Sequence, residues 1–556
     1  MLSSCLFRFP PFLKSNNVIK GISRHFSRKT RTIIDPSLET PSSGIVKLSP
    51  FNKLRTVAKK SYLPLSHVSK ALCTREGKFL YLKDEEGRSH CFSDERDVIV
   101  PYSIAEQYLN RCKKKCECVE IDPENIQTES NETSRSCLRQ SVISVVGEMD
   151  HGKTTLLDYL QHSSIQKQEF GGTTQIIRAN AISIPFYNSS NQLDSFKCTF
   201  LDTPGQSCFS FVPLLLLIRD NGSVLSDIAL YVVSLSEGPS EESHVIFNQL
   251  KANGVPVILV FTKSDLVTDE RKNSIQQTML AMASEYSVPI VDSCTISSVT
   301  GAGMEHFQQR LVELGKKYQR SVPLDVPAEA SILDSLLIPS QGIVFRALIQ
   351  QGQLSVRDDF ICGLYMGRVR SLVDLQSNSI SQAFPGMVVN VLGARKLPAA
   401  LRKNSQMLPT GHTLFVRDPK EIEAIMEQRL LEYAFNAAQC ATEEEERAEE
   451  EFALSDPGAT EIIHGEEYIE LKKQPIIVVA DNANSLSVIL ETLEKKPQFS
   501  VVRTRVGQIL DNDIEQCKSS NTKIVSFNVD IPSDVHLGSH FIYSRLMSEL
   551  LESIEK

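Results

Sequence analysis

The sequence contains no tryptophan, and its longest apolar run falls far short of the ~18 residues that a membrane-spanning helix needs. The leucine-rich run at residues 214–218 is typical of a buried helix or strand. The thirteen cysteines are scattered, and the cluster Cys112, Cys116 and Cys118 lacks the paired C-x₂-C spacing of zinc sites. The sequence therefore predicts no membrane span, and its free thiols favour a reducing compartment over secretion.

Acidic residues are absent from the first 34 positions, which hold seven Lys and Arg. An acid-poor stretch rich in Arg and Ser is typical of an organelle transit peptide, and residues 24–27 resemble a matrix-processing site. A secretory signal fits less well because Arg8, Pro10 and Pro11 break the apolar part; a disordered basic tail is the plain alternative. We expect the mitochondrial matrix, with a plastid as the alternative. Removing the leader changes the net charge from −9 to about −16.

A chain of 556 residues is too long for one core, so we expect about three to five domains. The predicted fold class is α/β multidomain. Apolar runs that alternate with helices predict a parallel sheet covered on both faces, and later short β-rich runs between turns predict a barrel. The expected order begins with a transit peptide (1–34) and a small N-terminal module with linkers (35–139), in which the Pro/Ser-rich residues 35–64 are expected to be disordered. A P-loop GTPase domain (140–322) and a small β-barrel (323–418) follow. A linker helix and loop (419–473) then lead to a second small α/β domain with a C-terminal helix (474–556).

A phosphate-binding loop is the strongest motif. Residues 147–154 fit G-x-x-x-x-G-K-[ST] and lie between a strand-like run and a helix-like segment. In that context backbone N–H groups surround one phosphate, Lys153 pairs with the β- and γ-phosphates, and Thr154 holds Mg²⁺. The predicted nucleotide contacts in this loop are Gly147, Asp150, His151, Gly152, Lys153, Thr154 and Thr155.

Further motifs follow in the order of a GTPase. Asp202 and Gly205 end a strand as D-x-x-G, where the Asp reaches Mg²⁺ through water, and Thr174 can close over the metal as a switch. Thr262, Lys263 and Asp265 form T-K-S-D after another strand. The Asp265 carboxylate can accept N1–H and N2–H₂ of guanine, which adenine does not offer. The segment Ser297, Ser298 and Val299 would meet the guanine oxygen. A P-loop ATPase is therefore disfavoured.

These motifs resemble the translational GTPases, and Glu169-Phe170-Gly171-Gly172-Thr173-Thr174-Gln175 resembles the first switch of bacterial-type translation initiation factor 2. Residues 352–359 and 367–374 resemble that factor's second domain, and residues 476–531 its third. The resemblance implies an organellar factor that binds GTP or GDP with Mg²⁺ and hydrolyses GTP on the ribosome during initiation and subunit joining. It implies ribosomal subunits and ribosomal RNA as partners. We also expect a monomer, and a monovalent cation beside Asp150.

The sequence departs from the family pattern at several positions. Gln206 replaces a histidine after D-x-x-G; a glutamine can orient water, so the predicted catalytic residues are Gln206, Lys153 and Thr174. Thr262 replaces an asparagine that braces the P-loop, which predicts a loss of ~1 kcal/mol in affinity. Residues 211–218 form an apolar insertion, interpreted as a packed helix or, alternatively, an altered partner contact.

The family's C-terminal barrel, which holds initiator tRNA, has no counterpart in this sequence. Binding of initiator tRNA therefore stays open. The alternative function is a GTP-binding ribosome-assembly or scaffold protein with little turnover, and a less favoured one is another translational GTPase.

Overall fold

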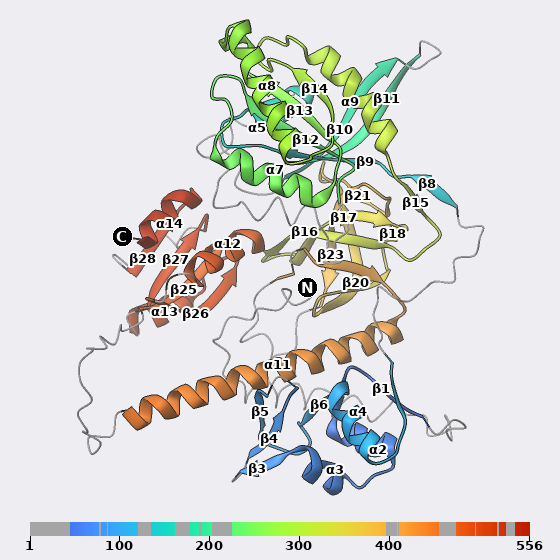
Figure 1. Ribbon diagram of the computed structural model, residues 1–556, viewed down its shortest axis with the longest axis vertical. Helices are drawn as coiled ribbons and strands as arrows, with labels where there is room; N and C mark the ends of the chain where they lie inside the picture. Colours follow the sequence, from blue (N-terminus) through green and yellow to red (C-terminus); the bar gives the residue numbers. More distant parts are fainter. Residues whose placement is uncertain are drawn as a thin grey trace.

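The computed structural model describes residues 45–76, 79–85, 87–119, 135–161, 178–187, 192–202, 225–395, 408–409, 411–454, 474–494, 496, 498–519, 522–529 and 540–555. In Figure 1 the P-loop domain lies at the top, the barrel in the middle, the C-terminal α/β unit beside the barrel, and an N-terminal module below the long helix α11. Within these residues no helix is both long and apolar enough to cross a membrane. The fold class predicted from the sequence is confirmed.

The P-loop domain is built on one six-stranded sheet, in the order β10-β11-β9-β12-β13-β14. All neighbouring pairs are parallel except β10 and β11, so the prediction of a parallel sheet is wrong at that edge. A short connection forces two successive strands to pair antiparallel, because a parallel pair needs a crossover. The strands are β9 (Ser141–Val146), β10 (Arg178–Tyr187), β11 (Leu193–Asp202), β12 (Ile228–Ser234), β13 (Val257–Thr262) and β14 (Ile290–Thr295).

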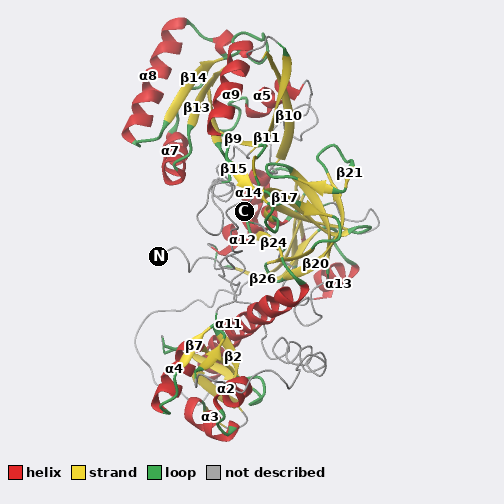
Figure 2. Cartoon of the chain, turned by 90° about the vertical axis from the view of Figure 1, so that its right-hand side faces the viewer, coloured by secondary structure: helices red, strands yellow, loops and turns green. Residues whose placement is uncertain are grey.

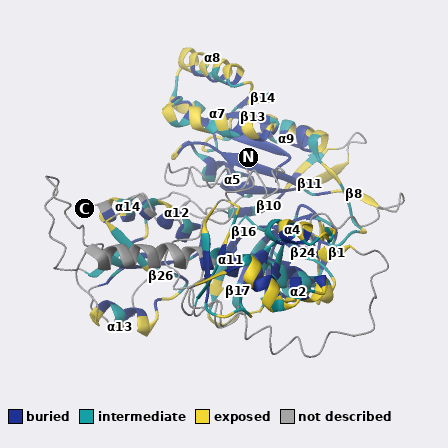
Figure 3. Ribbon diagram, turned by 60° about the horizontal axis from the view of Figure 1, so that its bottom comes forward, coloured by how far each residue is buried: buried dark blue, intermediate teal, exposed yellow. Residues whose placement is uncertain are grey.

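Helices cover both faces of this sheet. Strand β12 alternates its side chains: Leu230 joins the core under α5 and α9, while Tyr231 joins the core under α7 and α8. Figure 2 shows α8 and α9 on opposite sides of the strands, and Figure 3 shows buried strands beneath exposed outer helix faces. The helices are α5 (Lys153–Gln161), α7 (Glu241–Asn253), α8 (Asp269–Glu285) and α9 (Met304–Tyr318).

The barrel is a seven-stranded sheet in the order β19-β24-β16-β17-β23-β20-β21. It closes because β19, the first strand of this order, pairs with β20 as well as with β24. Phe345 packs edge-on against Phe360 and Tyr365 in its interior. The strands of this sheet are β16 (Glu329–Ile338), β17 (Gly342–Gln351), β19 (Asp359–Cys362), β20 (Tyr365–Val373), β21 (Ser379–Ile380), β23 (Val388–Ala394) and β24 (Thr413–Val416); β18 (Leu354–Ser355) pairs with β22 (Gln382–Ala383) beside it.

A buried ionic cluster joins the P-loop domain to the barrel. Arg139 is 2% exposed; it donates to Asp227 Oδ1 at 2.6 Å and to Gln350 Oε1 of the barrel at 2.7 Å. Asp227 also accepts from the Val142 N–H and pairs with Arg320 at 3.0 Å. A buried charge is stable when such partners surround it, so this cluster fixes the barrel beneath β9. Part of the predicted linker also forms strand β8 (Ser136–Leu138), which pairs with β15 (Ser321–Pro323).

The N-terminal module packs against α11 (Pro419–Leu454), which is the helix predicted within the linker over 419–473. Its buried His90 stacks on Phe435 of α11 with ring centroids 3.8 Å apart. The disorder expected over residues 35–64 is wrong from residue 45 onward, because alternating apolar side chains there fold onto the module core. The elements are β1 (Val46–Leu48), β2 (Phe51–Lys53), α2 (Leu54–Ser61), α3 (Leu65–Leu72), β3 (Thr74–Glu76), β4 (Phe79–Lys83), β5 (Ser89–Phe92), β6 (Ile99–Pro101), α4 (Tyr102–Arg111) and β7 (Cys116–Cys118).

The C-terminal unit is a four-stranded parallel sheet, in the order β26-β25-β27-β28. Asn484 of this unit donates to the Leu333 carbonyl of the barrel at 2.9 Å. The predicted C-terminal helix is α14, which begins after the short strand β28. The elements are β25 (Gln474–Ala480), α12 (Ala483–Glu494), β26 (Phe499–Val506), α13 (Asp511–Ser519), β27 (Lys523–Phe527), β28 (Phe541–Ser544) and α14 (Met547–Glu555).

Candidate functional site

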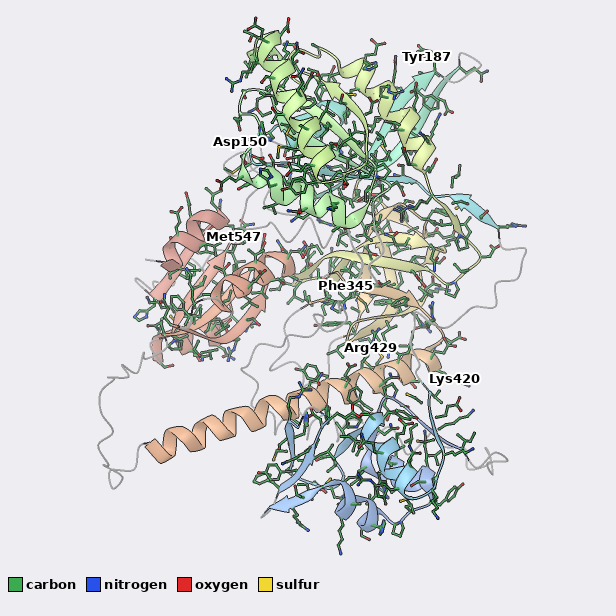
Figure 4. All side chains as sticks on the ribbon, viewed as in Figure 1. Asp150, Tyr187, Phe345, Lys420, Arg429 and Met547 are labelled. Carbon is green, nitrogen blue, oxygen red and sulfur yellow. The ribbon has the colours of Figure 1, made fainter. Side chains whose placement is uncertain are left out.

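The loop between β9 and α5 has the backbone of a phosphate cradle. Gly147 has φ 151°, and a Cβ built there would lie 2.4 Å from the Val232 carbonyl oxygen, so only glycine fits beside β12. Asp150 and Gly152 also adopt positive φ, at 60° and 86°. These conformations turn the loop back over the start of α5, where helix N–H groups favour an anion. Asp150 lies at the edge of the P-loop domain (Figure 4).

Lys153 is held beneath this loop. Its Nζ donates to the Gly147 and Glu148 carbonyl oxygens, both at 2.7 Å, and the residue is only 6% exposed. Burial lowers the pKa of Lys153 to about 8, although Asp202 and Asp150 act in the opposite direction. A phosphate beside the loop would raise this pKa again, so the lysine is placed to gain from binding an anion.

The predicted metal-binding side chains reach the same place from two elements. Thr154 begins the first turn of α5, and the buried Asp202 ends β11 opposite Val145 of β9. The carboxyl ends of β9 and β11 thus bring a hydroxyl and a carboxylate beside Lys153. Both are oxygen ligands of the kind that Mg²⁺ prefers, so the donor set fits a nucleotide bound with Mg²⁺.

The T-K-S-D segment follows β13 and touches the P-loop. Thr262 Oγ1 donates to the His151 carbonyl oxygen at 2.7 Å, so the threonine braces the loop where the family has asparagine. Lys263 adopts φ 56° and its Nζ pairs with Glu237 Oε1 at 2.7 Å. Asp265 is exposed at the start of a short 3₁₀ turn.

The Asp265 carboxylate is oriented by the next loop. A hydrogen bond from Ser297 holds the pKa of Asp265 below its usual range, so the group is ionised and acts as an acceptor. Ser297 is buried, and its Oγ also accepts from the Thr300 N–H at 3.2 Å. Ser298 and the exposed Val299 lie on the rim of this loop. The structure therefore brings 262–265 and 297–299 together, as the motif order predicts.

A polar network behind the P-loop was missed by the sequence reasoning. Glu148 Oε1 accepts from Ser243 of α7 at 2.5 Å, and its other oxygen lies 3.6 Å from His151 Nε2. His151 Nε2 is also 3.6 Å from Glu237, which pairs with Lys263. His151 is among the predicted nucleotide contacts, but Glu148 occupies an unspecified position of the motif, so nothing in the pattern marks it or the contacts that His151 makes. The network links the phosphate loop to the lysine of the base-recognition motif.

Several predicted residues lie outside the described part of the chain. They are Thr174 with the rest of the first switch segment, Gly205, Gln206 and the apolar insertion at 211–218. Their roles stay predictions.

Comparisons with known proteins agree with this geometry. Residues 139–319 match the elongation factor Tu GTP-binding domain, residues 327–401 match elongation factor G domain 2, and residues 453–537 match translation-initiation factor 2.

Individual relatives share at most about a third of their aligned residues with this chain. The chain is 25% identical over 513 residues to a chloroplastic translation initiation factor IF-2 of Pyropia yezoensis, covering 88% of this chain and 61% of that protein. It is 30% identical over 400 residues to an IF-2 of Persephonella marina, covering 70% and 41%. It thus spans less than two thirds of the length of each of these relatives. The structure of GDP-bound aIF5B from Aeropyrum pernix aligns at a TM-score of 0.41 and 19% identity, covering 75% of this chain and 74% of that one.

Proposed function

We propose that the chain is a translational GTPase of the initiation factor 2 family, and that it binds GTP at this site and hydrolyses it on a ribosome during initiation. The observation that carries the proposal is the joint arrangement of two half-sites. Lys153 is buried under the glycine-bearing loop, and Thr262 ties that loop to the segment that holds Asp265. One half fits phosphates and the other fits guanine, and a direct hydrogen bond fixes their separation.

Each predicted residue then has a role. Lys153 binds the β- and γ-phosphates, and the loop from Gly147 to Thr155 supplies N–H donors to them. Asp265 selects guanine by accepting from its N1–H and N2–H₂, while Lys263 packs on the ring once it leaves Glu237. Thr154 and Thr174, with Asp202 through water, hold Mg²⁺. When bound, the metal neutralises charge on the β- and γ-phosphates.

Hydrolysis requires a positioned water. We assign this role to Gln206, since a glutamine side chain can accept from water and donate to a phosphate oxygen at once. Gln206 lies outside the described residues, so this assignment rests on its place after D-x-x-G. A monovalent cation beside Asp150 is a further part of the proposal.

The cellular setting is also a proposal. An acid-free leader of 34 residues favours an organelle, with the mitochondrial matrix ahead of the plastid, and the partners are then organellar ribosomal subunits and their RNA. Imaging a fusion of residues 1–40 distinguishes the two organelles.

Multiple-turnover GTP hydrolysis, measured with and without organellar ribosomes, tests the function. Unassisted turnover should be slow, on the order of 10⁻⁴–10⁻² s⁻¹, and ribosomes should accelerate it strongly. Lys153→Ala should abolish both rates, while Lys70→Ala, in the N-terminal module, should leave them unchanged.

Two outcomes separate the alternatives. Ribosome binding without accelerated turnover would favour an assembly or scaffold protein. Filter binding of labelled initiator tRNA tests whether that RNA is a further partner.

A further inference from the structure

The N-terminal module differs in charge from the rest of the chain. Residues 45–119 hold fifteen Lys and Arg and nine Asp and Glu, a net charge of +6, whereas the whole chain carries −9. The module takes no part in the nucleotide site. An excess of positive charge on one module of an acidic protein marks a surface for a polyanion.

Much of this charge gathers on one surface, here called the basic face. It comes from the end of α2, from β1 and from the turn between α4 and β7, which are neighbours in Figure 1. Lys60 Nζ donates to the Lys47 carbonyl at 2.9 Å, the Lys115 carbonyl accepts from the Val46 N–H at 2.8 Å, and Lys114 bonds the Ser61 carbonyl. The exposed basic residues of this face are Lys47, Lys59, Lys60, Arg111, Lys113 and Lys115.

An aromatic ring stands within the basic face. Tyr62 is 74% exposed and follows the last turn of α2, with its N–H bonded to the Lys59 carbonyl at 3.2 Å. Its φ is 54°, a left-handed conformation that helix ends usually give to glycine and that costs free energy in a bulky residue. The fold thus holds an unburied ring at a fixed place between lysines. Folding alone gives no reason for a tyrosine there.

Acidic groups border this surface. Glu117 lies across from Lys47 in the β1–β7 pair, and Glu427 of α11 attracts Lys60 electrostatically.

We propose that the basic face binds single-stranded RNA, with the lysines on phosphates and Tyr62 stacked on a base. Stacking on an exposed ring requires an unpaired base, and a positively charged surface follows the backbone without reading sequence. An acidic peptide would satisfy the lysines but leave the ring without a partner. The choice of RNA over DNA rests on the proposed function, but the binding does not depend on GTP turnover.

Fluorescence anisotropy with the full chain and a fluorescein-labelled, unstructured 20-nucleotide RNA in 100 mM KCl tests the proposal. The triple variant K59E/K113E/K115E should bind about 30-fold more weakly, and its salt slope should fall by about 2, at about 0.7 per lost phosphate contact. The matched control R75E/K83E/R96E reverses three exposed charges outside the basic face, two of them on the β3–β4–β5 sheet, and should lose less than about threefold. The basic leader contributes the same background to every variant.

The ring is tested separately. Tyr62→Ala should weaken binding about tenfold, whereas Tyr62→Phe should retain it, and a duplex RNA of equal length should bind at least about tenfold more weakly than the single strand. Thermal unfolding and GTP affinity should stay unchanged in all variants, which excludes misfolding. Equal losses in the two triple variants, or duplex binding as tight as single-strand binding, would overturn the proposal. Loss of GTP hydrolysis with RNA binding intact would count against the proposed function alone.

Discussion

The P-loop domain and the C-terminal unit each have a sheet, parallel except for the β10–β11 pair of the first, in which a central buried strand leads into a helix. In the first, residues 147–152 separate β9 from α5; in the second, only residues 481–482 separate β25 from α12. The longer loop turns on glycines with positive φ and leads into a helix N-terminus, which favours an anion. The shorter one is closed by its own side chains: Asn482 Oδ1 accepts from the Ser485 N–H, and Asn528 bonds Asp481.

The strand-to-helix turn thus has a different role in each of the two sheets. An open turn with Lys153 beneath it fits a phosphate, while a turn capped by asparagine satisfies itself and frees the unit to dock on the barrel through Asn484. Topology alone therefore does not identify a nucleotide site. The backbone conformation of the loop and the lysine beneath it do.

Lys153→Ala should have the largest effect on the difference in nucleotide binding between the two turns. Removing two charge-assisted contacts to phosphates costs about 4 kcal/mol, or roughly a 1,000-fold loss of GTP affinity. Titration with a fluorescent GTP analogue measures the loss. Asp513→Ala disrupts an ion pair with Arg503 and Arg505 in the C-terminal unit and serves as the control, because GTP affinity should not change. A similar loss in both variants would contradict the assignment.

Asp265→Asn should change the base preference of the first unit. The amide cannot accept both guanine donors, so GTP affinity should fall about 100-fold. It can donate to the 2-oxo group of xanthine, so xanthosine triphosphate should bind better than GTP. Competition between the two nucleotides measures this. An unchanged preference would show that Asp265 does not face the base.

Asp334→Asn should change how the stability of the junction between the barrel and the C-terminal unit depends on pH. Burial raises the pKa of Asp334 to about 7, and the nearby Asp481 adds to the effect. The folded chain therefore binds more protons than the unfolded chain between pH 4 and 7, and the stability contributed by this group falls as pH rises through that window.

An amide does not titrate. The free energy of unfolding of the variant should therefore rise relative to that of the native protein as pH increases, by on the order of 2 kcal/mol at pH 8. Urea unfolding at pH 5 and pH 8 measures the difference, followed through the barrel and the C-terminal unit. A gain that does not depend on pH would reject the titration of Asp334 as its cause.

Asn482→Ala should have the smallest effect. Removing the cap of α12 should cost ~1 kcal/mol in the free energy of unfolding, with GTP affinity unchanged. The matched variant Ser240→Ala removes the cap of α7 in the P-loop domain and should cost a similar amount. Denaturant unfolding compares the two; a loss of GTP affinity in Asn482→Ala would mean that the second turn also contributes to nucleotide binding.

Much of this comparison was predictable from the sequence. The first site could be proposed from the sequence because its residues stand in motifs of fixed spacing. Gly147, Gly152 and Lys153 belong to the phosphate-binding motif, and Asp265 belongs to the guanine-binding motif. The closed second turn was not predicted, because asparagine caps have no spacing rule that separates them from ordinary turns. The Arg139–Asp227 cluster and the stacking of His90 on Phe435 join residues far apart in the chain, and no local pattern encodes such contacts.

The central claim is that only the first of the two sheets carries a nucleotide site among the described residues. Isothermal titration of the full chain with GTP and with ATP tests it most directly. We predict one GTP bound per chain, with ATP bound at least about 100-fold more weakly because it lacks the donors that Asp265 accepts. Two nucleotides per chain, or equal affinity for GTP and ATP, would contradict the account.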